Sequence, residues 1–190
     1  IQTEEEDGGN TNQLNIKLNN LVIGDITNLM VQQPRFEGIA NGNITLKNIF
    51  ADLKADARLN TSQLRVDNDS VGLVNITAGF DAKTGKLPFF VESDNKDYKI
   101  RANGFYNLSD TAKQPLYTNI QLNDTRINFV EQFLTGIFSD VDGRATGQLS
   151  IEGNPSSPTL LGNVLVKNAT LKVDYTQVNY QIDSLRIQFL

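Results

Sequence analysis

The 190-residue chain contains no His, Cys or Trp, and these absences exclude much chemistry. Without His and Cys there is no Ser-His-Asp or Cys-His nucleophile pair, no imidazole general base, and no zinc site built from imidazole or thiolate. Only carboxylates, Lys, Tyr and hydroxyl groups remain for catalysis. We therefore expect a protein that is not an enzyme and that uses no metal and no cofactor.

Positive charge is also scarce, because 17 Lys and Arg residues stand against 22 Asp and Glu residues, giving a net charge of −5. Nucleic-acid affinity depends on Lys and Arg that displace counterions from phosphates, so a nucleic-acid partner is not expected. Long hydrophobic runs are absent as well: runs such as Leu21–Ile23 are far shorter than the roughly 20 residues that span a bilayer.

The two ends of the sequence differ in character. Residues 1–10 contain the acidic run Glu4–Asp7 followed by two Gly, which predicts an acidic linker. Residues 11–190 then read as a single unit. Its last residues alternate like a strand up to Leu190, so we expect a piece excised from a longer chain.

Apolar residues recur at every second position through almost the whole sequence, which is typical of strands with one buried face. In residues 143–153, Gly, Ala, Leu and Ile alternate with Arg, Thr, Gln, Ser and Glu. Residues 51–59 alternate in the same way, which favours a strand there over a helix. Turn signals such as Asn41-Gly42, Asp67-Asn68 and 83–85 lie between or beside these runs. We predict an all-β, mainly antiparallel sheet.

Small residues stand at several positions that should face inward. Gly inside a strand costs packing and entropy, so it usually marks a sharp bend or a close approach between backbones. The pattern therefore predicts a strongly curved sheet. The small inward residues are Gly38, Ala40, Gly42, Ala145, Gly147 and Gly162.

One segment has helical character. Asn128 is a candidate N-cap, Glu131 follows three residues later, and Gly136 is suited to end the helix in the left-handed region. We predict one short helix near residues 129–135, which either caps the end of the sheet or lies over the mouth of a groove as a lid.

The two halves of the chain contain a weak repeat. Residues 38–46 and 143–151 share the form Gly-x-Ala-x-Gly-x-aliphatic-x-aliphatic, which predicts a repeated strand with a small, bending start and an apolar end. In the second copy the pattern continues through Gly153, Pro158, Gly162, the alternating Val residues after it and Asn168 to Tyr175.

This long pattern, preceded by 129–134 and 141–143, resembles the conserved domain of the TamB family, the AsmA-related translocation and assembly module proteins of Gram-negative bacteria. It is most similar to the versions found in Bacteroidetes. The resemblance covers about residues 125–190, whereas residues 10–125 resemble the family only in their Asn-rich alternating strands.

The resemblance implies a U-shaped sheet, the β-taco, with an apolar concave interior. It further implies a periplasmic segment of an inner-membrane-anchored envelope protein that reaches an Omp85-class (TamA-like) outer-membrane protein. The implied function is non-enzymatic: transport of phospholipid, or assembly of outer-membrane proteins, between the two membranes. Expected partners are phospholipid acyl chains or outer-membrane β-strands, together with neighbouring β-units of the same parent chain.

The expected lining of the groove consists of the inward apolar residues. These are Leu14, Ile16, Leu18, Ile44, Leu46, Val74, Ile76, Phe80, Leu116, Ile120, Leu122, Leu149, Ile151, Leu160, Val164, Val166, Leu171 and Val173.

Two other functions remain open from the sequence. The same alternation fits a structural or adhesin-like β-solenoid with a filled core, whose exposed Asn- and Thr-rich face binds glycans or partners. A hydrolase that uses a pair of carboxylates, such as Asp140 and Asp142, is disfavoured because no Trp is present to stack on a sugar.

Overall fold

The computed structural model describes residues 2–4, 12–27, 35–67, 69–109, 115–134, 136–154 and 157–190. The chain is all-β, with one antiparallel sheet that is not closed into a barrel. The elements are β1 (Gln2–Glu4), β2 (Gln13–Val22), α1 (Ile23–Thr27), β3 (Phe36–Glu37), β4 (Ile39–Lys47), β5 (Lys54–Val66), β6 (Asp69–Asp81), β7 (Lys86–Asp94), β8 (Lys99–Asn107), β9 (Leu116–Arg126), η1 (Asn128–Phe133), β10 (Phe138–Asn154), β11 (Ser157–Val173) and β12 (Val178–Phe189).

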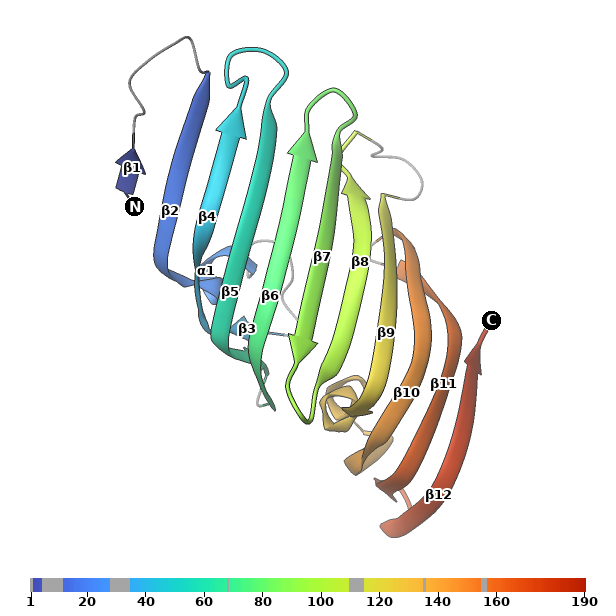
Figure 1. The fold of residues 1–190 in the computed structure, drawn as a ribbon. Coiled ribbons are helices and arrows are strands. Elements are labelled where there is room, and N and C mark those ends of the chain that lie inside the picture. The colour runs from blue at the N-terminus through green and yellow to red at the C-terminus, as the bar shows by residue number, and fades with distance from the viewer. Residues whose placement is uncertain are drawn as a thin grey trace.

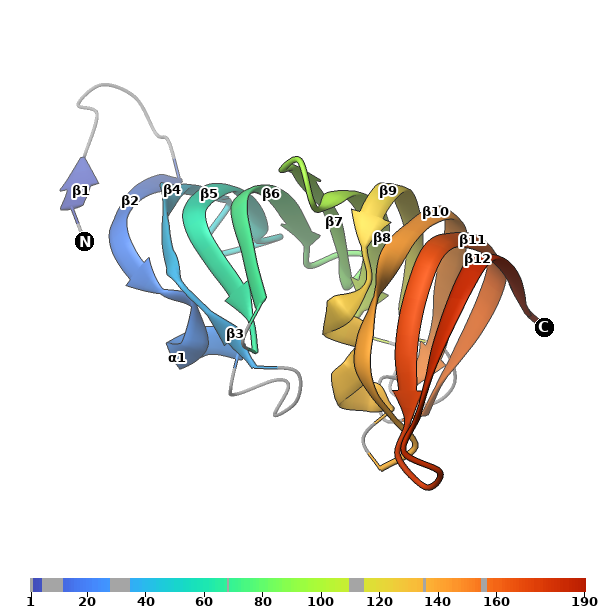
Figure 2. The ribbon, with the colours of Figure 1, turned by 90° about the horizontal axis from the view of Figure 1, so that it is seen from below.

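The strands lie side by side in chain order, from β1 at one edge to β12 at the other, and β3 pairs separately with β5 (Figure 1). The strands curve along their length, and α1 and η1 lie on the inner side of the curve (Figure 2). The predicted antiparallel, curved sheet is therefore confirmed. None of the described helices is long and apolar enough to cross a membrane.

Some local expectations need correction. Residues 2–4, inside the expected linker, pair with β2 as β1, and the rest of residues 1–10 lies outside the described part. Asn41-Gly42, expected as a turn, lies inside β4. The expected helix is a 3₁₀ helix whose N-cap is Ile127 instead of Asn128, because the Asn128 side chain bonds to other elements. Gly136 does adopt a left-handed φ of 82°.

The sequence repeat is part of a larger structural duplication. Apart from the two-residue strand β3, which precedes β4, the order β2, α1, β4, β5, β6 matches the order β9, η1, β10, β11, β12. The residue that follows each first strand donates its N–H to an equivalent Gly carbonyl: Ile23 to Gly38 at 2.9 Å and Ile127 to Gly143 at 3.1 Å. Strands β7 and β8 lie between these two repeats.

A bulge in the first strand of each repeat is also duplicated. Asn20 in β2 and Asp124 in β9 have positive φ values of 55° and 50°. The N–H of Asn20 donates to Asn41 Oδ1 at 2.9 Å, and the N–H of Asp124 donates to Thr146 Oγ1 at 3.0 Å. Asn and Asp tolerate this left-handed conformation better than most residues, and bulges bend the strands that contain them.

The equivalent small residues share their conformation and burial. Gly38 and Gly143 both have a φ of 142°, and Ala40 and Ala145 are 2% and 1% exposed. The bend brings neighbouring backbones together on its inner side, so the space there admits only small side chains. We call this band of bulges and small residues the crease.

The buried core follows the crease. Within the described part of the chain it contains nine apolar residues, of which all but Tyr98 are Ala or Val. One cluster contains Ala145, Val164, Val166 and Ala169, and the other contains Val71, Val74 and Tyr98. Away from the crease, the sheet has no second layer among the described residues.

Gly147→Ala should test the crease. A Cβ at residue 147 would overlap the Asn163 carbonyl oxygen and lie 2.8 Å from Val164 Cα, so the two strands must separate. We expect a loss of about 2–3 kcal/mol in the free energy of unfolding, measured by urea denaturation.

Gly79→Ala in β6 is the matched control. The nearest atom to a Cβ there is Pro88 Cγ at 3.5 Å, an ordinary contact, so its stability should change by less than about 0.5 kcal/mol. Equal losses of stability in the two variants would contradict the conclusion that the crease admits only small side chains.

Candidate functional site

One face of the sheet carries an apolar row that crosses ten strands. Each residue in the row is the direct cross-strand partner of the next, so their side chains point to the same side. From β2 to β12 the row reads Leu18, Gly42, Leu59, Ile76, Val91, Ala102, Ile120, Leu149, Gly162 and Phe189. We call the side of the sheet that carries this row the apolar face.

The apolar face is the inner face of the curved sheet. Figure 2 places η1 on the inner side, and Ile127, which immediately precedes η1, packs against the cluster of Ala145, Val166 and Ala169. The opposite side, which we call the polar face, carries Lys17, Asn43 and Arg58 in direct register.

The structure brings the expected groove residues together. Leu14 and Leu46 are cross-strand partners, as are Ile16 and Ile44, and Ile151 pairs with Leu160. Among the 18 expected lining residues, only Val74, Val164 and Val166 are buried, and the other side chains are half-buried. The expected small residues are also in place: a Cβ at Gly42 or Gly162 would overlap the backbone of the next strand.

The total surface indicates how open this arrangement is. The chain exposes 12668 Å², whereas a compact monomer of 21.0 kDa exposes about 9,000 Å². A sheet packed against a second layer hides one side of each strand. The large total is consistent with a single-layered sheet, and the half-buried state of most expected lining residues leaves part of the inner wall exposed to solvent.

Helix η1 is held at the inner side by polar contacts. Tyr98 Oη donates to Asn128 Oδ1 at 2.8 Å, and Asn128 Nδ2 donates to Asp69 Oδ1. The N–H of Val141 donates to Glu131 Oε2 at 2.9 Å, which joins η1 to β10. Burial raises the pKa of Asp69 above its ordinary value. Of the apolar helix residues, the side chains of Phe129 and Phe133 lie outside the described part.

Charged residues beside η1 form a network. Arg126 donates to both carboxylate oxygens of Asp142, at 3.0 and 2.9 Å, and this contact holds the pKa of Asp142 below its ordinary value. Arg144 reaches Asp124 at 2.9 Å and Asp97 at 3.3 Å. Asp142, considered above for catalysis, is therefore half of an ion pair. No group of three or more acidic residues among those described could hold a metal.

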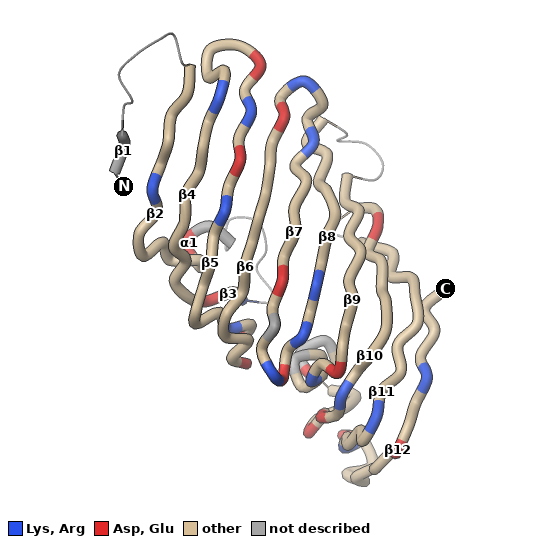
Figure 3. The backbone as a smooth tube through the Cα atoms, in the orientation of Figure 1, with Lys and Arg blue, Asp and Glu red and all other residues tan. Residues whose placement is uncertain are grey.

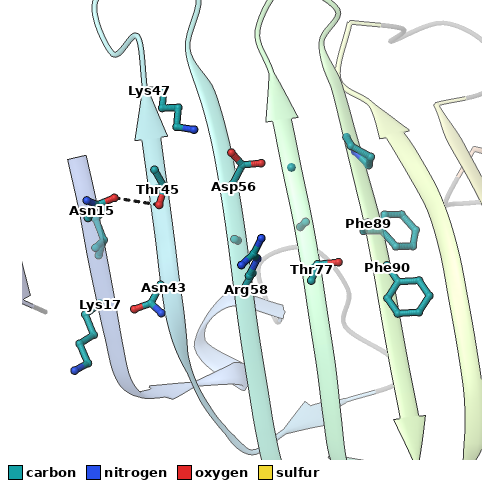
Figure 4. Close-up of a pocket in the computed structure, with 15 residues that line it drawn as sticks. Asn15, Lys17, Asn43, Thr45, Lys47, Asp56, Arg58, Thr77, Phe89 and Phe90 are labelled. Atoms are coloured by element: carbon teal, nitrogen blue, oxygen red, sulfur yellow. Dashed lines mark hydrogen bonds between the residues drawn. The ribbon is translucent and has the colours of Figure 1, made fainter. Parts of the chain in front are cut away.

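The polar face contains a feature that the sequence did not reveal. A hollow of about 1160 Å³ lies between β2 and β7, and its charged lining residues are Lys17, Lys47, Asp56 and Arg58 (Figure 4). Thr45 Oγ1 donates to Asn15 Oδ1 at 3.0 Å within it. Alternation alone predicts only that these residues face water. Their gathering in one hollow depends on register and sheet shape.

Comparisons with known proteins yield no relative: no family model matches the chain, and neither does any curated protein or solved structure. The function therefore has to be inferred from the open apolar face and the polar hollow.

The Arg126–Asp142 ion pair predicts a pH dependence. Because the folded pKa of Asp142 is lowered, the stability it contributes is present above its ordinary pKa and is lost as the pH falls through the lowered value. Both side chains are nearly half exposed, so Asp142→Asn should cost below about 1 kcal/mol near pH 7.

Urea denaturation of Asp142→Asn and the wild type at about pH 7 and about pH 2 checks this. The two proteins should differ at the higher pH and converge at the lower one. The control is Asp183→Asn, at an exposed residue of β12. Its stability should match that of the wild type at both pH values. A difference for Asp142→Asn that persists at low pH would contradict the ion-pair account.

Proposed function

We propose that this chain is a TamB-like β-taco unit, a non-enzymatic apolar groove of the Gram-negative periplasm. It shelters phospholipid acyl chains, or outer-membrane β-strands, on their way between the inner and outer membranes. The observation that supports this most directly is the apolar row, which runs across ten strands on an open inner wall.

The energetics favour such a device for lipid. Exposing a CH₂ group to water costs about 0.8 kcal/mol, so a 16-carbon chain costs about 13 kcal/mol. A groove that contacts the acyl chain while leaving the head group in water removes most of this barrier. The half-buried state of Leu18, Ile76 and Leu149 leaves their outer surfaces available for that contact.

The open edges of the sheet support the expected protein partners. Only three residues of β1 pair with β2 at one edge, and among the described residues no strand pairs with the outer side of β12. Edges of this kind accept further strands. We propose that neighbouring units of a parent chain extend the sheet there, and that an Omp85-class protein receives the cargo.

Photo-crosslinking tests whether lipid enters the groove. Benzoylphenylalanine placed at Ile76 or Leu149, on the apolar face, should capture radiolabelled phospholipid from vesicles. Thr77 and Gln148 are adjacent to these residues in the chain but lie on the polar face. The same group placed there should capture at least about fivefold less phospholipid, because it points away from the apolar wall. Equal capture on both faces would overturn the proposal.

A charge placed in the apolar row should block the binding of an acyl chain. Ala102 and Asn103 are neighbours on β8 and point to opposite faces. Ala102→Glu should weaken the binding of a fluorescent fatty acid at least tenfold, because the acyl chain would then contact an unpaired charge. Asn103→Glu, on the polar face, should leave the affinity for the fatty acid unchanged. Circular dichroism of both variants checks that the sheet is intact.

The same pair of variants distinguishes the two cargoes. If the groove carries β-strands instead of lipid, a synthetic amphipathic strand peptide should bind the wild type and lose affinity with Ala102→Glu, while the fatty acid fails to bind any of the three proteins. Binding of neither probe would leave the apolar face without cargo and would contradict the proposed function.

A further inference from the structure

The charged and polar side chains of the hollow lie on the side of the sheet that the proposed groove does not use, so their chemistry differs from that of the groove. Strands β2, β4, β5, β6 and β7 all contribute to it, so it extends across five strands. Neighbouring strands are about 4.8 Å apart, which gives the hollow a width of roughly 19 Å. A ligand that fills it is elongated.

Two of its cations stand in one cross-strand row. Lys17 pairs with Asn43, and Asn43 pairs with Arg58 on its other side, so the two positive charges flank one amide. Among the described residues, neither cation has a carboxylate partner within ion-pair distance, and neither does Lys47. Among the described lining residues Asp56 is the only acidic one, so they carry an excess of positive charge in a chain whose net charge is negative.

The other lining groups suit hydroxyl-rich ligands. Asn15, Asn43, Thr45 and Thr77 supply amide and hydroxyl groups that both donate and accept hydrogen bonds. At the far side of the hollow, Phe90 is 37% exposed and belongs to the same cross-strand row as Thr77 (Figure 4). An exposed aromatic ring offers a flat apolar surface beside these polar groups.

The duplication shows that the fold does not require these charges. In the second repeat, Gln121 occupies the position of Lys17, and Asn163 occupies the position of Arg58, each in the same register beside the equivalent Gly. Figure 3 marks cations along β2, β4 and β5 and few along the upper parts of β10 to β12. The cations at these two positions are therefore a property of the first repeat.

We propose that this hollow binds an anionic oligosaccharide. The guanidinium of Arg58 and the ammonium of Lys17 pair with carboxylate or phosphate groups on the sugar, and Arg suits such groups because it donates two parallel hydrogen bonds. The Asn and Thr side chains bond to sugar hydroxyls, and a sugar ring stacks on Phe90. This inference does not depend on the function proposed for the apolar face.

Calorimetric titration with an oligogalacturonate tests the proposal, with a neutral galactose oligomer and inorganic phosphate as comparison ligands. The acidic oligomer should bind, and raising the salt from about 20 mM to about 300 mM should weaken it several-fold because the pairing is solvent-exposed. The neutral oligomer should bind at least about tenfold more weakly, since it cannot use the two cations. Titration with a phosphorylated oligosaccharide then tests whether phosphate groups can replace carboxylate groups as the source of negative charge.

The residues of the second repeat indicate which substitutions to make in the first. Lys17→Gln with Arg58→Asn places in the first repeat the residues that the second repeat carries, so the sheet should keep its thermal stability. This double variant should bind oligogalacturonate at least about tenfold more weakly. The matched control, Lys167→Gln with Arg186→Asn, removes the same two charges from exposed positions on β11 and β12 and should bind like the wild type.

Three results would overturn the proposal. One is the absence of oligogalacturonate binding, and another is an equal loss in the two double variants, which would indicate general attraction to surface charge. The third is saturation by inorganic phosphate alone with an affinity equal to that of the oligosaccharides, which would leave the sugar-contacting residues without a role.

Discussion

The structure depends on one constraint: each strand must bend sharply while its hydrogen-bonded ladder continues on both sides. A bend brings neighbouring backbones close together on the inner side, so the residues there must lack bulk. Ala40 and Ala145 meet this requirement with almost no exposed surface, and Gly42 and Gly147 have no room for a Cβ. The core of the protein is consequently a narrow band along the crease, and large apolar side chains stay half-buried on the inner wall.

The sequence predicts the class of fold well because the alternation of period two is nearly unbroken, and the repeat around Gly38 and Gly143 predicts curvature. It misplaces Asn41-Gly42 as a turn, since the same two residues that favour a turn also suit a bend within a strand. It also places the N-cap at Asn128, whose side chain is instead drawn to Tyr98 and Asp69 by tertiary contacts. Such contacts join distant segments and leave no local pattern.

The two faces differ in how far they can be predicted. The alternation marks an apolar face along each strand, so the sequence names Leu18, Ile76 and Leu149. The register shows that they share a row and adds Leu59, Val91, Ala102 and Phe189, which were not among the expected lining residues. The polar hollow corresponds to no such pattern in the sequence. Lys17 and Arg58 are far apart in the chain, and any exposed strand carries similar residues. Only the order of strands and the shape of the sheet bring them to one hollow.

The duplication separates what the fold needs from what is free to serve function. Features present in both repeats, such as the positive φ at Asn20 and Asp124 and the shared Gly conformations, build the crease. Features present in one repeat only are not needed to form the sheet. Lys17 and Arg58 belong to that second group, whereas the apolar row continues through both repeats. A continuous apolar wall and a local charged hollow therefore differ in physical origin: the first follows from the repeated strand pattern, and the second is an addition that the fold tolerates.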